Sequence, residues 1–151
     1  MAIHTAMNAL HLLFAALWVG SVFFVTLGVL PFARRGEFNA APLESVVSRL
    51  KTVSRASVLV LLVTGGHLAG TGYTTETLFG STRGHLVLAM VALWFVLAAL
   101  VEVGSARLAR GLAERKVREP AARARPFFLA ASAVGVLLFV NAALITSPLS
   151  F

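Results

Sequence analysis

Four long stretches without charge constrain this chain more than any other feature. Residues 1–33, 56–75, 84–101 and 126–151 contain no Lys, Arg, Asp or Glu. A helix needs about 20 apolar residues to cross the hydrocarbon of a bilayer, and each stretch offers room for one such helix. Because backbone polar groups must be paired inside lipid, helices suit these lengths better than barrel strands. The sequence therefore predicts four transmembrane helices, at about residues 3–32, 43–71, 83–112 and 125–147.

The composition supports a membrane protein and excludes several other classes. Of the 151 residues, 58% are hydrophobic and only 13% are charged, whereas a soluble domain carries about 25% charged residues. This excludes a soluble enzyme and a nucleic-acid-binding protein, despite a net charge of +7. The chain has no Cys and no Asp, which excludes disulfides, thiolate metal sites and a Ser-His-Asp triad. We expect one domain, residues 1–151.

The distribution of basic residues predicts the orientation in the membrane. Twelve of the thirteen Lys and Arg residues lie around the first and third connections, and only Arg83 lies in the second. The positive-inside rule places the first and third connections in the cytoplasm. Both termini then lie on the outer side, and the expected location of the protein is the inner (plasma) membrane. Short connections favour antiparallel neighbours, so the predicted fold is all-α, an up-down bundle of four transmembrane helices.

All four histidines fall in the predicted outer half. His4 and His11 lie on the first span, His67 near the outer end of the second, and His85 at the start of the third. His4, Met7 and His11 recur at helical spacing and form one stripe. With a rise of ~1.5 Å per residue, His11 and His67 each lie roughly 6 Å deep. Ionisable groups inside a membrane are costly, so these positions are candidate functional sites.

Two kinds of cofactor suit this pattern. Histidine and methionine without thiolates or carboxylates suit a copper ion, above all Cu(I), and the candidate metal ligands are His4, Met7, His11, His67 and His85. Two imidazoles across a bundle also suit the iron of a b-type haem, with a candidate site made of His11, Trp18, Gly66, His67 and Asn141. The structural alternative is that the histidines and Asn141 only make hydrogen bonds between helices.

One acidic residue interrupts the inner part of the third span. Glu102 lies seventeen residues after His85 and reaches the inner interface. An ion pair with Arg55 or Arg107 accounts for it better than a role in proton relay.

Several short segments resemble CopD-like copper-resistance membrane domains. They are Ala9–Leu13 with Leu17–Gly20 on the first span, Arg49–Leu50 and Val53–Arg55 followed by Leu61–Gly65 on the second, Gly84–Leu88 on the third, and Asn141–Pro148 on the fourth. The resemblance implies copper uptake or handling, with His4, Met7 and His11 as an outer capture stripe. His67 and His85 would then form a deeper site, and a periplasmic copper protein is an expected partner.

The first-span pattern, His11 followed by Trp18 and Gly20, also resembles HemJ-type protoporphyrinogen oxidases. That resemblance implies His11 as a haem ligand and a redox protein as partner. Both families tend to have a lysine early in the third helix, where this chain has Ala89 and Met90. A third hypothesis is a structural subunit of a larger membrane complex or a homo-oligomer. The residues leave open whether the protein is an enzyme.

Overall fold

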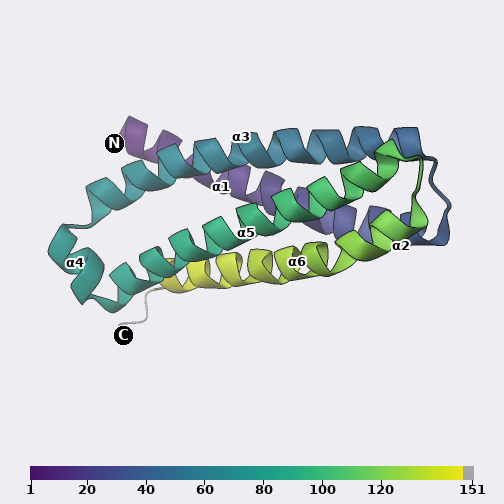
Figure 1. Cartoon of the computed structure of the whole chain (residues 1–151). Coiled ribbons are helices and arrows are strands. Elements are labelled where there is room, and N and C mark those ends of the chain that lie inside the picture. The colour runs from purple at the N-terminus through teal and green to yellow at the C-terminus, as the bar shows by residue number, and fades with distance from the viewer. Residues whose placement is uncertain (148–151) are drawn as a thin grey trace.

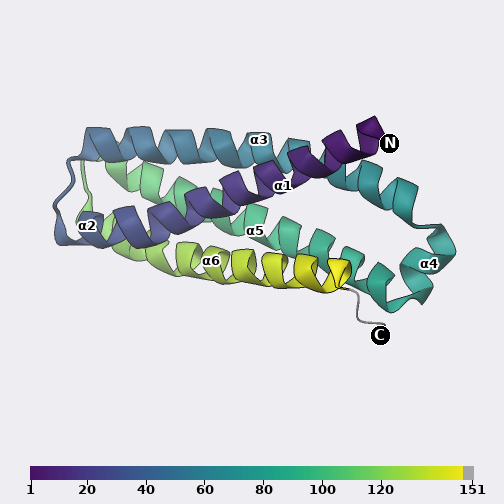
Figure 2. The same ribbon diagram turned by 180° about the vertical axis from the view of Figure 1, so that it is seen from behind.

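The chain folds into helices joined by short turns (Figures 1 and 2). The structure is a computed structural model that describes residues 1–147, so Pro148 of the closing motif lies outside the described part. The helices are α1 (Ala2–Phe23), η1 (Phe24–Val29), α2 (Leu30–Arg35), α3 (Ala40–Gly72), α4 (Thr75–Gly80), α5 (Thr82–Ala113) and α6 (Arg118–Thr146). Residues 1–147 contain no strand, which confirms the all-α prediction.

Three helical segments are long and apolar enough to cross a membrane. They are the continuous run Ala2–Arg35, which includes η1 and α2, and the helices α5 and α6. The helix α3 has 33 residues, but it is not among these candidates. Basic residues lie in its first half and Gly and Thr lie in its second half. Both features lower its mean hydropathy. A membrane protein is thus supported, and a fourth crossing by α3 stays a prediction.

The helix ends differ from the predicted spans mainly at α6. This helix begins at Arg118, seven residues before the predicted start at residue 125. Pro120 lies in its first turn, where the missing N–H of proline has no intrahelical partner to lose. Pro126 lies inside the helix without ending it. The π-helical turn η1 and the short helix α4 are further elements that periodicity does not predict.

The first helical run crosses the molecule diagonally. The helix α1 packs on α3, whereas η1 and α2 pack against α6. The helix α5 packs on both α3 and α6. The start of α1, α4 and the end of α6 lie at one end of the molecule, and the α2–α3 and α5–α6 turns lie at the other (Figure 1).

The buried side chains come from all four long helices. They include Trp18 of α1, Leu50 of α3, Leu97 of α5 and Phe128 of α6. Many other large apolar side chains are exposed, as expected for a surface that faces lipid. Association of helices in lipid depends on close packing at small residues. An added Cβ at Gly135 of α6 would lie 2.7 Å from a side-chain carbon of Val19 on α1.

Candidate metal centre

Two histidine rings lie close together where the start of α1 packs near the end of α3. The ring centres of His4 and His67 lie 6.3 Å apart, and the planes are tilted by 48°. His4 is exposed and His67 is half-buried. Met7, which lies between His4 and His11 on α1, is also half-buried. The sequence predicted these side chains as metal ligands. The structure brings together His4 of α1 and His67 of α3, which lie 63 residues apart in the sequence.

His11 lies two turns further along α1 and binds α3 through Thr64. Its Nδ1 is 2.9 Å from Thr64 Oγ1, and that hydroxyl donates its single hydrogen to the carbonyl of Val60 at 2.7 Å. When the hydroxyl hydrogen is used for Val60, the hydroxyl accepts from His11 and Nδ1 carries the proton. In a neutral imidazole the other nitrogen, Nε2, then has a free lone pair. Thr64 thus selects the tautomer of His11 that can bind a metal through Nε2.

Trp18 makes the next polar contact along the same interface. Its Nε1–H donates to Ser54 Oγ at 2.8 Å, and the side chain is 1% exposed. Trp18 was predicted at a cofactor site, but here it is a buried residue that links α1 to α3. Ser54 also lines a cleft of about 390 Å³ between α3 and α5.

His85 and Asn141 do not join the histidines of α1 and α3. His85 Nε2 lies 2.8 Å from the carbonyl oxygen of Phe79 in α4. Asn141 Nδ2–H donates to the carbonyl of Leu86 at 2.8 Å, so it ties α6 to α5. This is the interhelical hydrogen bond that we gave as the structural alternative for Asn141.

The structure does not gather all candidate ligands at one point. Within residues 1–147, no group of three or more His, Cys, Asp or Glu side chains could hold a metal ion. Gly66 faces open space, and an added Cβ at Gly65 would lie 3.1 Å from His11 Cε1. What remains is a pair, His4 and His67, with His11 close to the same interface. The ligand roles of all five candidates stay predictions.

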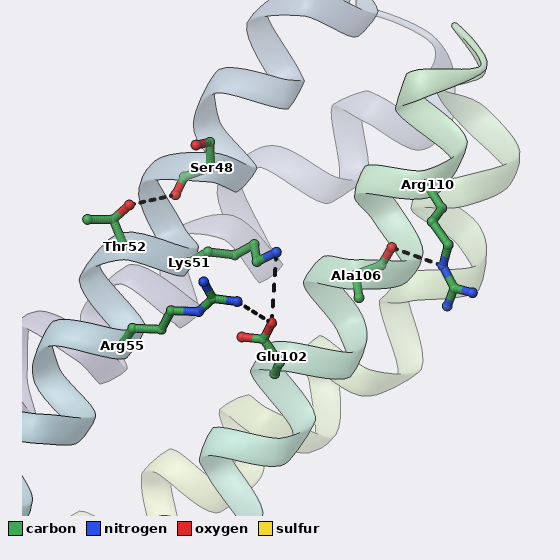
Figure 3. A network of polar contacts seen from close by, with 7 residues as sticks. All are labelled: Ser48, Lys51, Thr52, Arg55, Glu102, Ala106 and Arg110. Carbon is green, nitrogen blue, oxygen red and sulfur yellow. Dashed lines mark hydrogen bonds and ion pairs between the residues drawn. The ribbon is translucent and has the colours of Figure 1, made fainter.

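The acidic residue Glu102 forms a separate polar cluster between α3 and α5 (Figure 3). Its Oε1 lies 2.8 Å from an Arg55 nitrogen and 3.8 Å from Lys51 Nζ. The predicted ion pair with Arg55 is confirmed. Arg107 instead lies over the ring of Phe127, with its guanidinium carbon 4.4 Å from the ring centre.

Sequence reasoning missed the hydrogen-bond partners Thr64 and Ser54. Thr64 shares a helical face with His67, three residues later, and that spacing predicts an inward side chain. The spacing alone does not predict which residue of α1 lies opposite. Ser54 lies in a segment that resembles CopD-like domains, but that resemblance does not predict a hydrogen bond to Trp18.

Comparison with known proteins identifies one family. A family model described as "Copper resistance protein D" matches residues 44–145, which is most of the chain. The chain belongs to the CopD family. Its resemblance to CopD-like domains is therefore confirmed. No curated protein and no solved structure was found to match the chain.

The CopD match has a clear boundary within the candidate site. It includes nearly all of α3 and α6 and the whole of α5, so His67, His85 and Asn141 fall inside it. The helix α1 lies before residue 44, so His4, Met7 and His11 fall outside it. The family model thus supports a copper-resistance membrane protein, while half of the histidine pair comes from a segment that it does not cover.

Proposed function

We propose that this CopD-family protein captures copper at the outer side of the membrane, for uptake or handling, through the imidazoles of His4 and His67. The observation that carries the proposal is the 6.3 Å separation of the two rings. A metal–imidazole bond is about 2.0–2.1 Å long, and a ring nitrogen lies roughly 1.2 Å from its ring centre. Linear coordination therefore needs ring centres about 6.4 Å apart. The tilt of 48° is no obstacle, because rings can rotate about a linear bond axis.

The neighbouring side chains support copper over other metals. The donors at this interface are imidazoles and the thioether of Met7, with no carboxylate or thiolate among them. Such donors suit Cu(I), whereas zinc usually takes four ligands, often including Cys or a carboxylate. His11, held in one tautomer by Thr64, is the next available imidazole along α1. In this proposal, His4 and His67 receive the ion and His11 is the deeper ligand.

The proposed topology has four crossings with both termini outside, in the plasma membrane. Its support is that α1 begins and α6 ends at the same end of the molecule, while both basic turns lie at the other (Figure 1). The histidine pair then faces the outside, where a soluble copper protein is the proposed donor.

Haem receives no support from the residues around these histidines. A macrocycle beside His11 would need the space next to Gly65. An added Cβ there would already lie 3.1 Å from the His11 ring. The residues present do not fit a haem between His11 and His67, so no step is assigned to one.

The test is Cu(I) binding by the purified full-length protein in detergent, measured by competition with a coloured Cu(I) chelator. We expect His4→Ala and His67→Ala each to weaken binding at least tenfold, because each removes one of two ligands. His11→Ala should weaken it as well. Copper accumulation by cells that express the same variants then tests uptake.

His85→Ala is the matched control. His85 is also on the outer side, but its ring contacts the Phe79 carbonyl and lies apart from the pair. We expect it to bind Cu(I) like the unchanged protein. Equal binding by the His4→Ala, His67→Ala and His85→Ala variants would refute the proposed site.

A further inference from the structure

A charged cleft lies at the opposite end of the molecule, where α5 ends and α6 begins. It has a volume of about 420 Å³. Pro120 of α6 packs closely on Gly111 of α5, since an added Cβ at Gly111 would lie 2.0 Å from the proline ring. This close approach brings charged residues of both helices to one cleft. Those residues are Arg107, Arg110, Glu114, Lys116, Glu119 and Arg123.

The two carboxylates of the cleft already have partners. Lys116 Nζ lies 2.8 Å from Glu114 Oε2, and an Arg123 nitrogen lies 2.6 Å from Glu119 Oε1. Among the described residues, neither Arg107 nor Arg110 has a carboxylate within ion-pair distance. The positive excess of the cleft therefore resides on two guanidinium groups.

These two arginines line the same cleft from one helix. Arg107 and Arg110 are three residues apart on α5, so they lie on the same helical face. The guanidinium of Arg107 is held 4.4 Å over the ring of Phe127. Within residues 1–147, the side chain of Arg110 makes one hydrogen bond, a long one of 3.4 Å from Nε to the Ala106 carbonyl (Figure 3). Its terminal nitrogens are left for a ligand, and planar guanidinium groups bind phosphate through paired hydrogen bonds.

The position along α5 matches the level of lipid phosphates. Val103 is an exposed apolar residue on a helix apolar enough to cross a membrane. Arg107 and Arg110 lie roughly 6 and 10 Å beyond it along the axis. The headgroup layer extends about 5–8 Å outside the hydrocarbon, and the long arginine side chains can reach back toward it.

We propose that Arg107 and Arg110 bind the phosphate of an anionic phospholipid such as phosphatidylglycerol. This site is separate from the copper site and does not depend on it. The ligand chemistry is a phosphate diester, and the lipid is the chosen source because the cleft lies where α5 leaves its apolar segment.

The experiment measures lipid bound to the full-length protein by native mass spectrometry, in detergent that contains equal amounts of phosphatidylglycerol and phosphatidylcholine. We expect the unchanged protein to retain phosphatidylglycerol preferentially. Arg107→Gln with Arg110→Gln should weaken that binding about 30-fold, since two cations near an anionic headgroup are lost. Replacing both arginines with Lys keeps the charge but loses the paired hydrogen bonds. Lipid binding by that variant should therefore be weaker than that of the unchanged protein and stronger than that of the glutamine variant.

The control is Arg34→Gln with Arg49→Gln. It makes the same change in net charge with exposed arginines of α2 and α3 that are not part of the cleft. We expect it to retain phosphatidylglycerol. Helix content by circular dichroism confirms that each variant is folded. Undiminished binding by the Arg107 and Arg110 glutamine variant overturns the proposal. So does equal loss in the control, or displacement of the lipid by millimolar inorganic phosphate, which would identify a free-anion site.

Discussion

Replacing Thr64 with valine tests the link between the α1–α3 interface and the metal chemistry of His11. The change removes the hydroxyl that accepts from His11 Nδ1 at 2.9 Å and keeps a branched side chain of similar shape. His11 then loses the contact that selects its Nε2 tautomer. Loss of such a supporting hydrogen bond typically lowers metal affinity 10–100-fold, which corresponds to about 1.4–2.7 kcal/mol.

The assay is Cu(I) competition on Thr64→Val, His11→Ala and the double variant. We expect Thr64→Val to weaken binding within that range, and to have no further effect once His11 is absent, because the threonine acts only through the imidazole. Thr71→Val is the matched control. Its hydroxyl also donates to a carbonyl of the same helix, that of His67 at 2.8 Å, but it contacts no imidazole nitrogen among the described residues.

Two results would refute this reasoning. One is a Thr64→Val protein that binds Cu(I) as tightly as the unchanged protein. The other is an equal further loss when Thr64→Val is added to His11→Ala, which would mean that the threonine affects the fold and not the ligand.

Two further predictions concern helix packing, and both are measured as the free energy of unfolding in detergent. Gly135→Ala should lower the free energy of unfolding by about 1–3 kcal/mol, because the added carbon has no room against α1. In the control Gly20→Ala, the added carbon meets no atom within 4 Å, so this change should be neutral or stabilising. Equal effects of the two changes would contradict the close packing at Gly135. Trp18→Phe should cost about 0.6–1.7 kcal/mol through the lost hydrogen bond to Ser54. Trp94→Phe should cost less, because Trp94 Nε1 has no partner in the described chain.

The helical fold could be predicted because charge-free length and periodicity are properties of each segment alone. The predicted span 83–112 differs from α5 by one residue at each end. The start of α6 was harder, because Pro120 is tolerated in a first turn as readily as before a helix. The helix α4 has only six residues, too few for a periodic signal.

The candidate site could be predicted only in part, because sequence does not determine the register between helices. Equal depth suggested that His11 lies opposite His67. The structure places His4 opposite His67 and Thr64 opposite His11, so the partner of His67 is two turns away on α1. Asn141 was easier, because an amide in an apolar helix must find a partner wherever the neighbouring helix lies.

The diagonal course of the first helical run has a mechanical consequence. Its N-terminal half is bound to α3 through His11 and Trp18. Its C-terminal half is bound to α6 through Thr26, which accepts a hydrogen bond from Ser132 at 3.0 Å. A rod held to different neighbours at its two ends acts as a lever. A swing that separates His4 from α3 first breaks the His11–Thr64 hydrogen bond, and a rigid helix then passes the movement on to the Thr26 contact, unless the wide turn of η1 bends to absorb it.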